Sequence, residues 1–321
     1  MKIFLFKIIE VTLFPITLFS AIWMKFLTFG GIDRSILAEK TFLCFGILPI
    51  RDHYYQPLIN PKKHLTKSLR EDRVLKGLDF NIKVQLNLLN QFSFNEELKI
   101  LPVIKKRQKT ELQFYYNNNS FESGDAEYYY NIIRFFKPNK LIEIGSGFST
   151  LMAEEALIKN KEEDNKYAPE HICIEPYEQG WLEKTKAKIL RKKVENIEIS
   201  FFKSLGKNDI LFIDSSHIIR PQGDVLFEIL EILPVLSSGV IVHIHDIFSP
   251  KDYPDDWILK EHRLWNEQYL LEAFLSHNKD FEIIGSLNYL MHNYPKQLKS
   301  VSPILNKQKN REPGSFWIRK K

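Results

Sequence analysis

Four side chains able to move protons or bind metal follow two apolar runs in the second half of the chain. Asp214 and His217 come after the first run, and His245 and Asp246 end the second. An imidazole titrates near neutral pH, so either histidine could take a proton from a hydroxyl group. Alternatively, Asp214, His245 and Asp246 could hold a divalent cation that acidifies an acceptor oxygen. The remaining alternative is structural, with His217 capping a helix and His245 a hydrogen-bonded core residue.

A second group of polar residues follows two earlier apolar runs. Leu141–Ile144 leads into Gly145-Ser146-Gly147, where glycines let a ligand lie against bare backbone. Glu143 lies within the first run, and Glu175 closes the run His171–Ile174. Because burying an unpaired carboxylate is costly, Glu143 must either contact a ligand or be tied to neighbouring groups of the protein.

The elements that position these groups alternate between strand and helix. Runs rich in β-formers predict parallel strands buried on both faces, and longer mixed segments between them predict helices. This alternation predicts an α/β fold with a doubly wound sheet, whose polar residues gather at the carboxyl edge. The predicted strands are 141–144, 171–175, 209–213, 239–244, 281–290 and 315–319, and the predicted helices are 84–92, 126–136, 149–161, 178–191 and 224–236.

Three motifs together resemble the class I S-adenosylmethionine (SAM)-dependent methyltransferases. The chain reads E-I-G-S-G-x-S-T from Glu143 to Thr150, D-x-S-H from Asp214 to His217, and H-D at His245-Asp246. The resemblance covers roughly residues 121–320. Thr150 stands where a dinucleotide-binding enzyme would have the third glycine of its fingerprint, which disfavours a nicotinamide cofactor.

The resemblance implies a seven-stranded Rossmann-like sheet and SAM as cofactor. It places Gly145, Ser146 and Gly147 beside the methionine portion, and Glu143 at its amino group. It places Glu175 on the ribose hydroxyls, since a carboxylate has two acceptor oxygens for a vicinal diol. Asp125, before the helix 126–136, would cover the cofactor or simply cap that helix. Related enzymes hold magnesium at these strand ends with acids, and His245 in place of an acid favours a softer cation.

The expected reaction is methyl transfer to an oxygen of a small-molecule or sugar-like acceptor. Tyr253 and Trp257 lie in a proline-rich loop where such enzymes build the acceptor pocket. Two alternatives stay open. One keeps the fold and changes the chemistry, since relatives with these motifs include hydroxylases by name. The other is a non-catalytic, membrane-associated binding module.

The amino-acid composition limits the kinds of partner that we expect this protein to bind. The chain has 321 residues, a formal charge of +5 and 44% hydrophobic residues, which is ordinary for a globular protein. Basic groups such as Lys105-Lys106-Arg107 read as solvated surface, so no nucleic-acid partner is expected. The two cysteines, Cys44 and Cys173, fit a reducing compartment without structural disulfides.

The amino terminus predicts an attachment region. Residues 1–30 are strongly apolar, and their longest charge-free run, Val11–Met24, is shorter than a membrane-spanning helix requires. We weigh three readings: a helix in a membrane interface, a helix packed on the protein's own core, and a secretory signal. We therefore predict an apolar segment at 1–30, a helical extension at 31–120, a catalytic domain at 121–321, and a cytoplasmic protein on the inner membrane face. Arg51–Pro57 is a candidate lid, although a surface turn is favoured.

Overall fold

The computed structural model describes residues 2–53, 55–105, 112–177 and 179–321, and the chain divides into two compact units. One unit comprises Met1–Ser68 with Ile258–Leu264, and the other comprises Leu69–Trp257 with Trp265–Lys321. The units divide at residue 68, whereas the sequence placed a boundary at residue 120. Leu88, Leu98 and Phe114 belong to the core on one face of the sheet, so the segment 69–120 packs as part of the second unit.

Within the described residues, seven strands form one sheet in the order β3-β2-β1-β4-β5-β7-β6. β1 to β5 are parallel, and β7 is antiparallel to both of its neighbours, β5 and β6. This is the seven-stranded Rossmann-like sheet that the sequence predicted. The strands are β1 Lys140–Ile144, β2 Glu170–Ile174, β3 Lys188–Leu190, β4 Ile210–Ile213, β5 Ile241–Ile244, β6 Phe281–Ser286 and β7 Phe316–Lys320.

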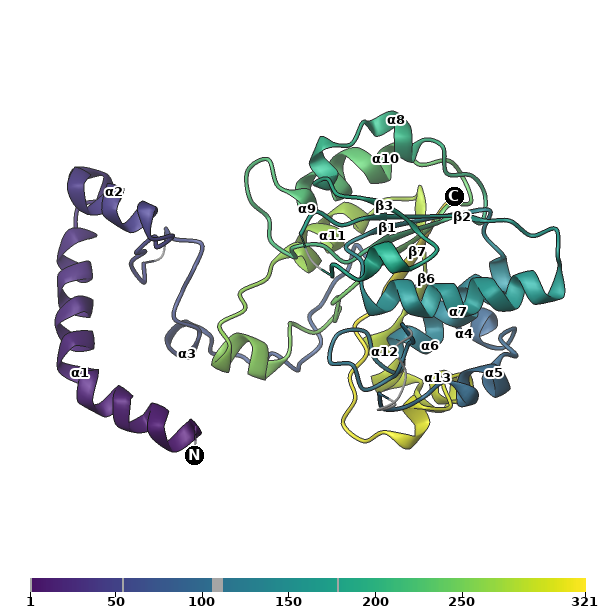
Figure 1. Ribbon diagram of the computed structural model, residues 1–321, viewed down its shortest axis with the longest axis horizontal. Coiled ribbons are helices and arrows are strands. Elements are labelled where there is room, and N and C mark those ends of the chain that lie inside the picture. Colours follow the sequence, from purple (N-terminus) through teal and green to yellow (C-terminus); the bar gives the residue numbers. More distant parts are fainter. Residues whose placement is uncertain (1, 54, 106–111, 178) are drawn as a thin grey trace. The chain divides into compact units, whose positions relative to one another are not determined.

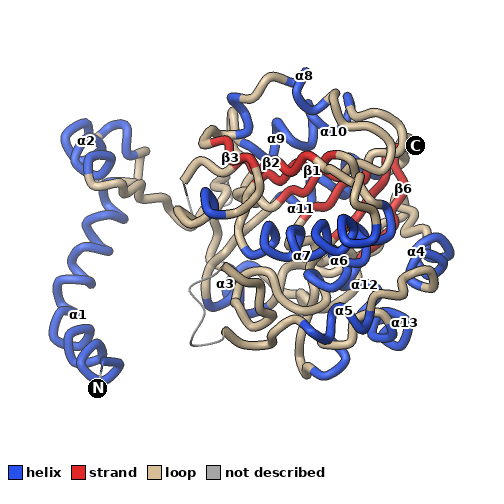
Figure 2. The backbone as a smooth tube through the Cα atoms, turned by 45° about the vertical axis from the view of Figure 1, so that its right-hand side comes forward, coloured by secondary structure: helices blue, strands red, loops and turns tan. Residues whose placement is uncertain are grey.

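Helices cover both faces of the sheet (Figures 1 and 2). Because side chains alternate along a strand, Leu141 joins the core beneath α6 and α7, whereas Ile142 joins the core beneath α9 and α11. The helices of this unit are α4 Ile82–Leu89, α5 Asn95–Ile100, α6 Asp125–Phe136, α7 Phe148–Glu163, η2 Leu182–Lys184, η3 Val194–Asn196, α8 Ile199–Phe202, α9 Asp224–Phe227, η4 Glu228–Ile232, α10 Leu233–Val235, η5 Asp256–Lys260 (which continues past this unit), α11 Glu267–Leu275, α12 Leu287–Asn293, α13 Pro295–Ser300 and η6 Leu305–Lys307.

Two predicted elements were wrong. The helix predicted at 178–191 contains the single turn η2 and then the strand β3, and its first residue lies outside the described residues. Here pairing with β2 overrides the helix propensity of a segment rich in lysine, glutamate and leucine. The strand predicted at 281–290 stops at Ser286, where α12 begins. The pairing of β6 with β7 is irregular between Ile283 and Gly285, so the strand is already distorted near its end.

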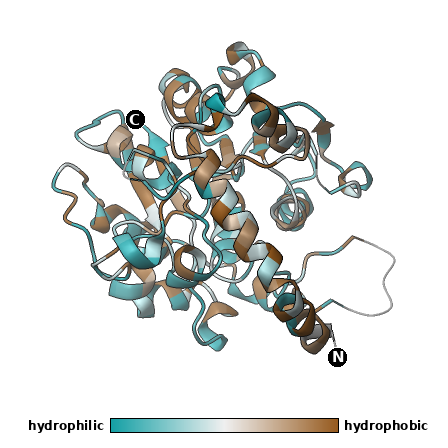
Figure 3. Cartoon of the chain, turned by 90° about the vertical axis from the view of Figure 1, so that its left-hand side faces the viewer, coloured by the Kyte–Doolittle hydropathy of each residue, from teal (hydrophilic) through white to brown (hydrophobic). Residues whose placement is uncertain are grey.

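The other unit contains α1 Lys2–Leu27, η1 Ile32–Arg34, α2 Ile36–Cys44 and α3 Pro61–His64. α1 continues through Pro15, and apolar residues recur along its length (Figure 3). The stretch Phe4–Leu27 has a mean hydropathy of 1.8, and none of its most apolar window is buried. By length and composition this helix could cross a membrane, which corrects the expectation that it is too short; a signal sequence meets the same criterion.

The candidate lid at Arg51–Pro57 forms local contacts in this unit. The Asp52 carboxylate accepts hydrogen bonds from the backbone N–H of Asn60 and from Lys63, and it lies 3.0 Å from His64 Nε2. Such contacts are those of the surface turn that we favoured. Tyr54, within the segment, lies outside the described residues.

Candidate active site

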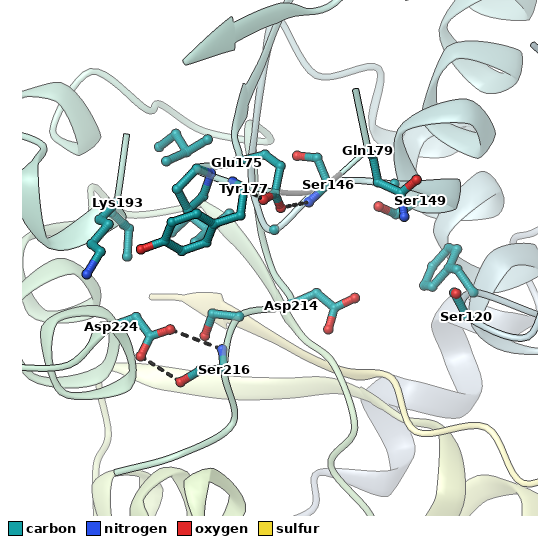
Figure 4. Close-up of a pocket in the computed structure, with 18 of the residues that line it drawn as sticks. Ser120, Ser146, Ser149, Glu175, Tyr177, Gln179, Lys193, Asp214, Ser216 and Asp224 are labelled. Carbon is teal, nitrogen blue, oxygen red and sulfur yellow. Dashed lines mark hydrogen bonds between the residues drawn. The ribbon is translucent and has the colours of Figure 1, made fainter. Parts of the chain in front are cut away.

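The carboxyl ends of β1, β2 and β4 line a cavity of about 520 Å³ (Figure 4). β1 lies between β2 and β4, so the connections that leave β1 and β4 run to opposite sides and open a crevice there. The polar and glycine residues that line it are Ser120, Gly145, Ser146, Gly147, Ser149, Glu175, Tyr177, Gln179, Lys193, Glu195, Asp214, Ser215, Ser216, Arg220 and Asp224. Five of the residues predicted from the sequence are among them.

Gly145 makes the turn that leaves β1. Its backbone φ is +74°, a left-handed conformation, and a Cβ atom there would lie 1.7 Å from the carbonyl oxygen of Asp214. The same turn is fixed by hydrogen bonds from Gly145 N to Ile174 O (3.0 Å) and from Asp214 N to Ile144 O (2.8 Å). Only glycine combines this conformation with this approach. The strand ends can therefore meet closely enough to share one cavity.

Ser146 and Glu175 form one wall of the cavity. The Glu175 carboxylate accepts hydrogen bonds from the backbone N–H groups of Ser146 (3.3 Å) and Tyr177 (2.9 Å). The Ser146 hydroxyl oxygen is buried and has no hydrogen-bond partner among the described residues. A buried hydroxyl without a partner is costly, so this wall fits a polar ligand that would satisfy it.

Glu143 lies outside this cavity lining. Its carboxylate is fully buried and accepts hydrogen bonds from Thr150 Oγ1 (2.6 Å) and Tyr129 Oη (2.9 Å), and His171 Nε2 lies 3.4 Å away. These contacts correspond to the structural alternative considered for this residue. Its predicted contact with the cofactor stays a prediction, and the geometry gives it no support.

Asp125 also lies outside the cavity lining. It begins α6, is 1% exposed, and accepts a hydrogen bond from the backbone N–H of Ser315 (2.7 Å). Arg311 lies 3.5 Å from its second oxygen. Asp125 therefore joins α6 to the segment that enters β7, and its cofactor role likewise stays a prediction.

The four predicted reaction-centre residues lie together at the ends of β4 and β5. His217 Nε2 lies 3.3 Å from Asp214 Oδ1 and 3.8 Å from Asp246 Oδ2. His245 Nε2 lies 3.5 Å from Asp246 Oδ1. Asp214 also lines the cavity, so the cluster is continuous with the cavity through this one carboxylate.

Three of these side chains could bind one cation. The ligand atoms of Asp214, His217 and Asp246 all lie within 4.8 Å of one another. In this set His217 takes the place that the sequence assigned to His245. Two carboxylates and one imidazole form a mixed oxygen and nitrogen donor set. Such a set suits manganese or iron, whereas magnesium typically binds an all-oxygen set.

The backbone at this cluster is unusual at two of its members. His217 has φ +60° and Asp246 has φ +55°, and both are in the left-handed region that side chains other than glycine seldom adopt. Such conformations persist only where surrounding contacts hold them, and they concentrate at functional sites. Here they turn the chain sharply after each strand, which brings the two loops together.

Charge pairing governs the protonation of the cluster. Burial lowers the pKa of His217, but the hydrogen bonds with Asp214 and Glu267 and the nearby carboxylate charges raise it well above the usual histidine value. Burial raises the pKa of Asp214, and the charges of His245 and His217 with the His217 hydrogen bond outweigh it, so the net pKa is lowered. Burial also raises the pKa of Asp246, which His245 and His217 offset only in part. The site therefore favours a charged imidazole beside an ionised Asp214.

Glu267, at the start of α11, is a site residue that the sequence reasoning missed. It is fully buried, and its Oε2 lies 2.9 Å from His217 Nδ1. The available signal was an acidic residue in the first turn of α11. Tyr253 and Trp257, the predicted pocket walls, instead pack in an aromatic cluster with Trp265, outside the lining of this cavity.

Comparison with known proteins matches the part of the chain that builds this site. A family model described as a methyltransferase domain matches residues 142–247, from β1 to the residue after Asp246. An uncharacterized protein of Archaeoglobus fulgidus is 30% identical over 168 residues, which cover 49% of this chain and 74% of that protein. A crystal structure described as a protein-L-isoaspartate O-methyltransferase of Plasmodium falciparum with S-adenosyl-L-homocysteine is 16% identical, with a TM-score of 0.30. The alignment covers 50% of this chain and 83% of that one, and at this TM-score it carries no further conclusion.

Proposed function

Because this chain belongs to the class I SAM-dependent methyltransferases, we propose that it transfers the methyl group of SAM to a hydroxyl oxygen of a small-molecule or sugar-like acceptor. One observation carries the choice of oxygen. Asp214 lines the cavity and at the same time contacts His217, so a carboxylate and an imidazole stand together where an acceptor would meet the cofactor. A hydroxyl acceptor requires removal of a proton, and the ionised Asp214 carboxylate can accept one.

The cavity supports SAM as the methyl donor. The glycine turn brings bare backbone to its wall, Ser146 offers an unsatisfied hydroxyl, and Glu175 offers carboxylate oxygens suited to a diol. SAM supplies an activated methyl group on a positively charged sulfur. The residues of the chain bind it, hold the acceptor in line with that methyl group and exclude water, which accounts for much of the rate enhancement such a reaction needs.

The proposed reaction is a single displacement at the methyl carbon. The acceptor oxygen forms a bond to the methyl carbon, the carbon–sulfur bond breaks, and its electron pair stays on sulfur. The hydroxyl proton passes to the ionised Asp214 carboxylate and later to water. The neighbouring Asp246 and Glu267 carboxylates stabilise the positive charge of the His217 imidazole.

Metal assistance is a further part of the proposal. Asp214, His217 and Asp246 would hold the cation, and their mutual distances support this assignment. A bound divalent cation would lower the pKa of the acceptor hydroxyl and so share the work of proton removal. If methyl transfer continues in the presence of EDTA, the proposed role of the metal is refuted, whereas the acid–base assignment is unaffected.

A radiolabel assay tests the proposed reaction. Protein with SAM labelled on the methyl group is incubated with panels of phenols, polyols and sugars, and labelled products are counted. Asp214→Asn should lower kcat by about 100-fold or more, since general acid–base groups contribute on this scale. Asp164→Asn, at an exposed loop position, is the matched control. An Asp214→Asn enzyme as active as wild type would refute the assignment.

We also propose that residues 1–30 contact a membrane. The exposed apolar side chains of α1 include Phe14, Phe19 and Trp23. The hydroxyls of Thr12 and Thr17 donate to the helix's own carbonyls, at 2.9 Å and 3.3 Å, so neither needs water. Polar groups satisfied within the helix are what a lipid environment demands.

A further inference from the structure

The imidazole of His217 is held at both of its nitrogens. Nε2 faces Asp214 and Asp246, on the side of the cavity. Nδ1 lies 2.9 Å from Oε2 of Glu267, which belongs to a different element, α11. A carboxylate can only accept, so with Glu267 ionised the proton of this hydrogen bond is on Nδ1. The ring is therefore oriented so that Nε2 is the nitrogen presented to the reaction.

The backbone of α11 holds the same residue a second time. The N–H groups of Asn266 (3.1 Å) and Glu267 (3.3 Å) both donate to the carbonyl oxygen of His217. Asn266 Oδ1 accepts the N–H of Ile219 at 2.6 Å, and the Trp265 ring packs on the His217 ring with 4.3 Å between centroids. Glu267, at the start of α11, and the two residues before it thus hold both the backbone and the ring of His217 in its left-handed conformation.

The next residue of α11 reaches the loop after β5. Gln268 Oε1 accepts the N–H of Phe248 at 2.8 Å, and Gln268 Nε2 donates to Lys251 O at 2.9 Å. The loop that carries Asp246 is therefore held from the same helix end as the loop that carries His217. The start of α11 acts as one support for both halves of the reaction centre.

The burial of Glu267 argues for a role beyond packing. The residue is fully buried, and its only described ion pair is with His217. Its second oxygen, Oε1, is buried without a hydrogen-bond partner in the described part of the chain. A buried carboxylate is costly, and a hydrophobic residue of similar size would often be at least as stable. The contact of the Glu267 carboxylate with His217, whose ring it orients, explains why a charged residue is buried here.

We propose that Glu267 is a positioning residue that fixes His217 with its proton on Nδ1 and Nε2 facing Asp214 and the acceptor. This inference rests on the proposed methyl transfer. It extends the site to a residue outside the three motifs and outside the cavity lining. Partners of a functional histidine at the far ring nitrogen commonly contribute about 10–100-fold to the activity of the site.

Nuclear magnetic resonance of the histidine side chains of the full chain tests the proposal directly. His217 is assigned by the signals that disappear in His217→Gln. In wild type we expect the Nδ1 proton to be visible and slow to exchange, because it is buried and bonded to Glu267. In Glu267→Gln we expect this proton signal to be lost or strongly shifted, whereas Glu231→Gln, at an exposed position, should leave it unchanged.

Calorimetry with SAM separates this inference from the proposed function. Glu267→Gln should bind SAM as wild type does, since Glu267 does not line the cavity, and kcat for the acceptor found in the screen should fall by about 10–100-fold. An Nδ1 without a protected proton in wild type overturns the inference even if Glu267→Gln does not fold. So does an unchanged His217 spectrum in Glu267→Gln. Failure of wild type to bind SAM would instead refute the proposed function.

Discussion

Gly145 is the residue whose replacement should disturb the site most for the smallest change in side chain. In Gly145→Ala the new methyl group would lie 1.7 Å from the Asp214 carbonyl oxygen, at a φ that alanine disfavours. The ends of β1 and β4 must then separate. We expect the free energy of unfolding to fall by more than about 2 kcal/mol and SAM binding to be lost.

Urea denaturation and SAM calorimetry measure these two effects. Gly180→Ala is the matched control, because no atom lies within 4 Å of a Cβ added there. A Gly145→Ala protein that keeps wild-type stability and SAM affinity would show that the close approach of the two strand ends is not required.

His171 should make stability depend on pH. Burial lowers the pKa of its imidazole, but hydrogen bonds with Cys173 and Glu143 outweigh this and raise it to about 10. Since the pKa is higher in the folded than in the unfolded chain, the stabilisation is complete below about pH 6.5 and is lost as pH rises through about 10. Its size is on the order of 5 kcal/mol, at roughly 1.4 kcal/mol per pKa unit between 6.5 and about 10.

Denaturation of wild type and His171→Gln between pH 6 and pH 10 checks this dependence. The stability difference between the two proteins should shrink as the pH rises. His277→Gln, at an exposed histidine, controls for general effects of the substitution. A difference that stays constant over this range would mean that His171 is not charged in the folded protein.

At the scale of elements, a substitution at Asp125 distinguishes a structural role from a cofactor-binding role for the start of α6. Asp125→Ala removes the acceptor for the Ser315 N–H, so the free energy of unfolding should fall by about 1–3 kcal/mol. SAM affinity should not change, because Asp125 does not line the cavity. Weakened SAM binding with unchanged stability would instead support the cofactor role predicted from the sequence.

The core strands could be predicted from the sequence because each is a continuous run of buried β-formers. β1, β2, β4 and β5 lie within or beside the runs identified, and the residue after each strand is one of the predicted turn or site residues. β3 could not be predicted, since its three residues are a strand only through pairing with β2. The end of β6 at Ser286 depends in the same way on tertiary contacts rather than on local pattern.

The residues of the site also fall into those that the sequence could predict and those that it could not. Gly145, Glu175 and Asp214 could be found because they stand next to apolar runs, and the topology then brings them to one cavity. Glu267 could not be found, because its partner His217 is 50 positions earlier in the sequence and no local pattern links them. Nor could the sequence show that Glu143, inside its strand, would be enclosed by Tyr129 and Thr150.

At the scale of the whole molecule, the exposed apolar surface of α1 predicts membrane binding by the amino-terminal unit. In flotation assays the full chain should rise with vesicles of phosphatidylcholine and phosphatidylglycerol. Introducing charges with Phe14→Glu and Phe19→Glu should abolish this, because charged groups are costly in the bilayer.

Leu230→Glu is the control for flotation, because it introduces a glutamate at an exposed leucine of the catalytic unit rather than of α1. Extraction of the vesicles with alkaline carbonate then distinguishes a helix held at the surface from one that crosses the bilayer. A full chain that remains with the soluble fraction at all lipid concentrations would contradict membrane binding.

The central claim, that the cavity at the ends of β1, β2 and β4 binds SAM, is tested most directly by titrating SAM into the full chain by calorimetry. Wild type should bind, and Glu175→Ala should weaken binding by about 1–3 kcal/mol through loss of its carboxylate acceptors. Glu198→Ala, at an exposed position outside the cavity lining, should bind as wild type does. Absence of binding in folded wild-type protein, or equal affinity in Glu175→Ala, would contradict the account.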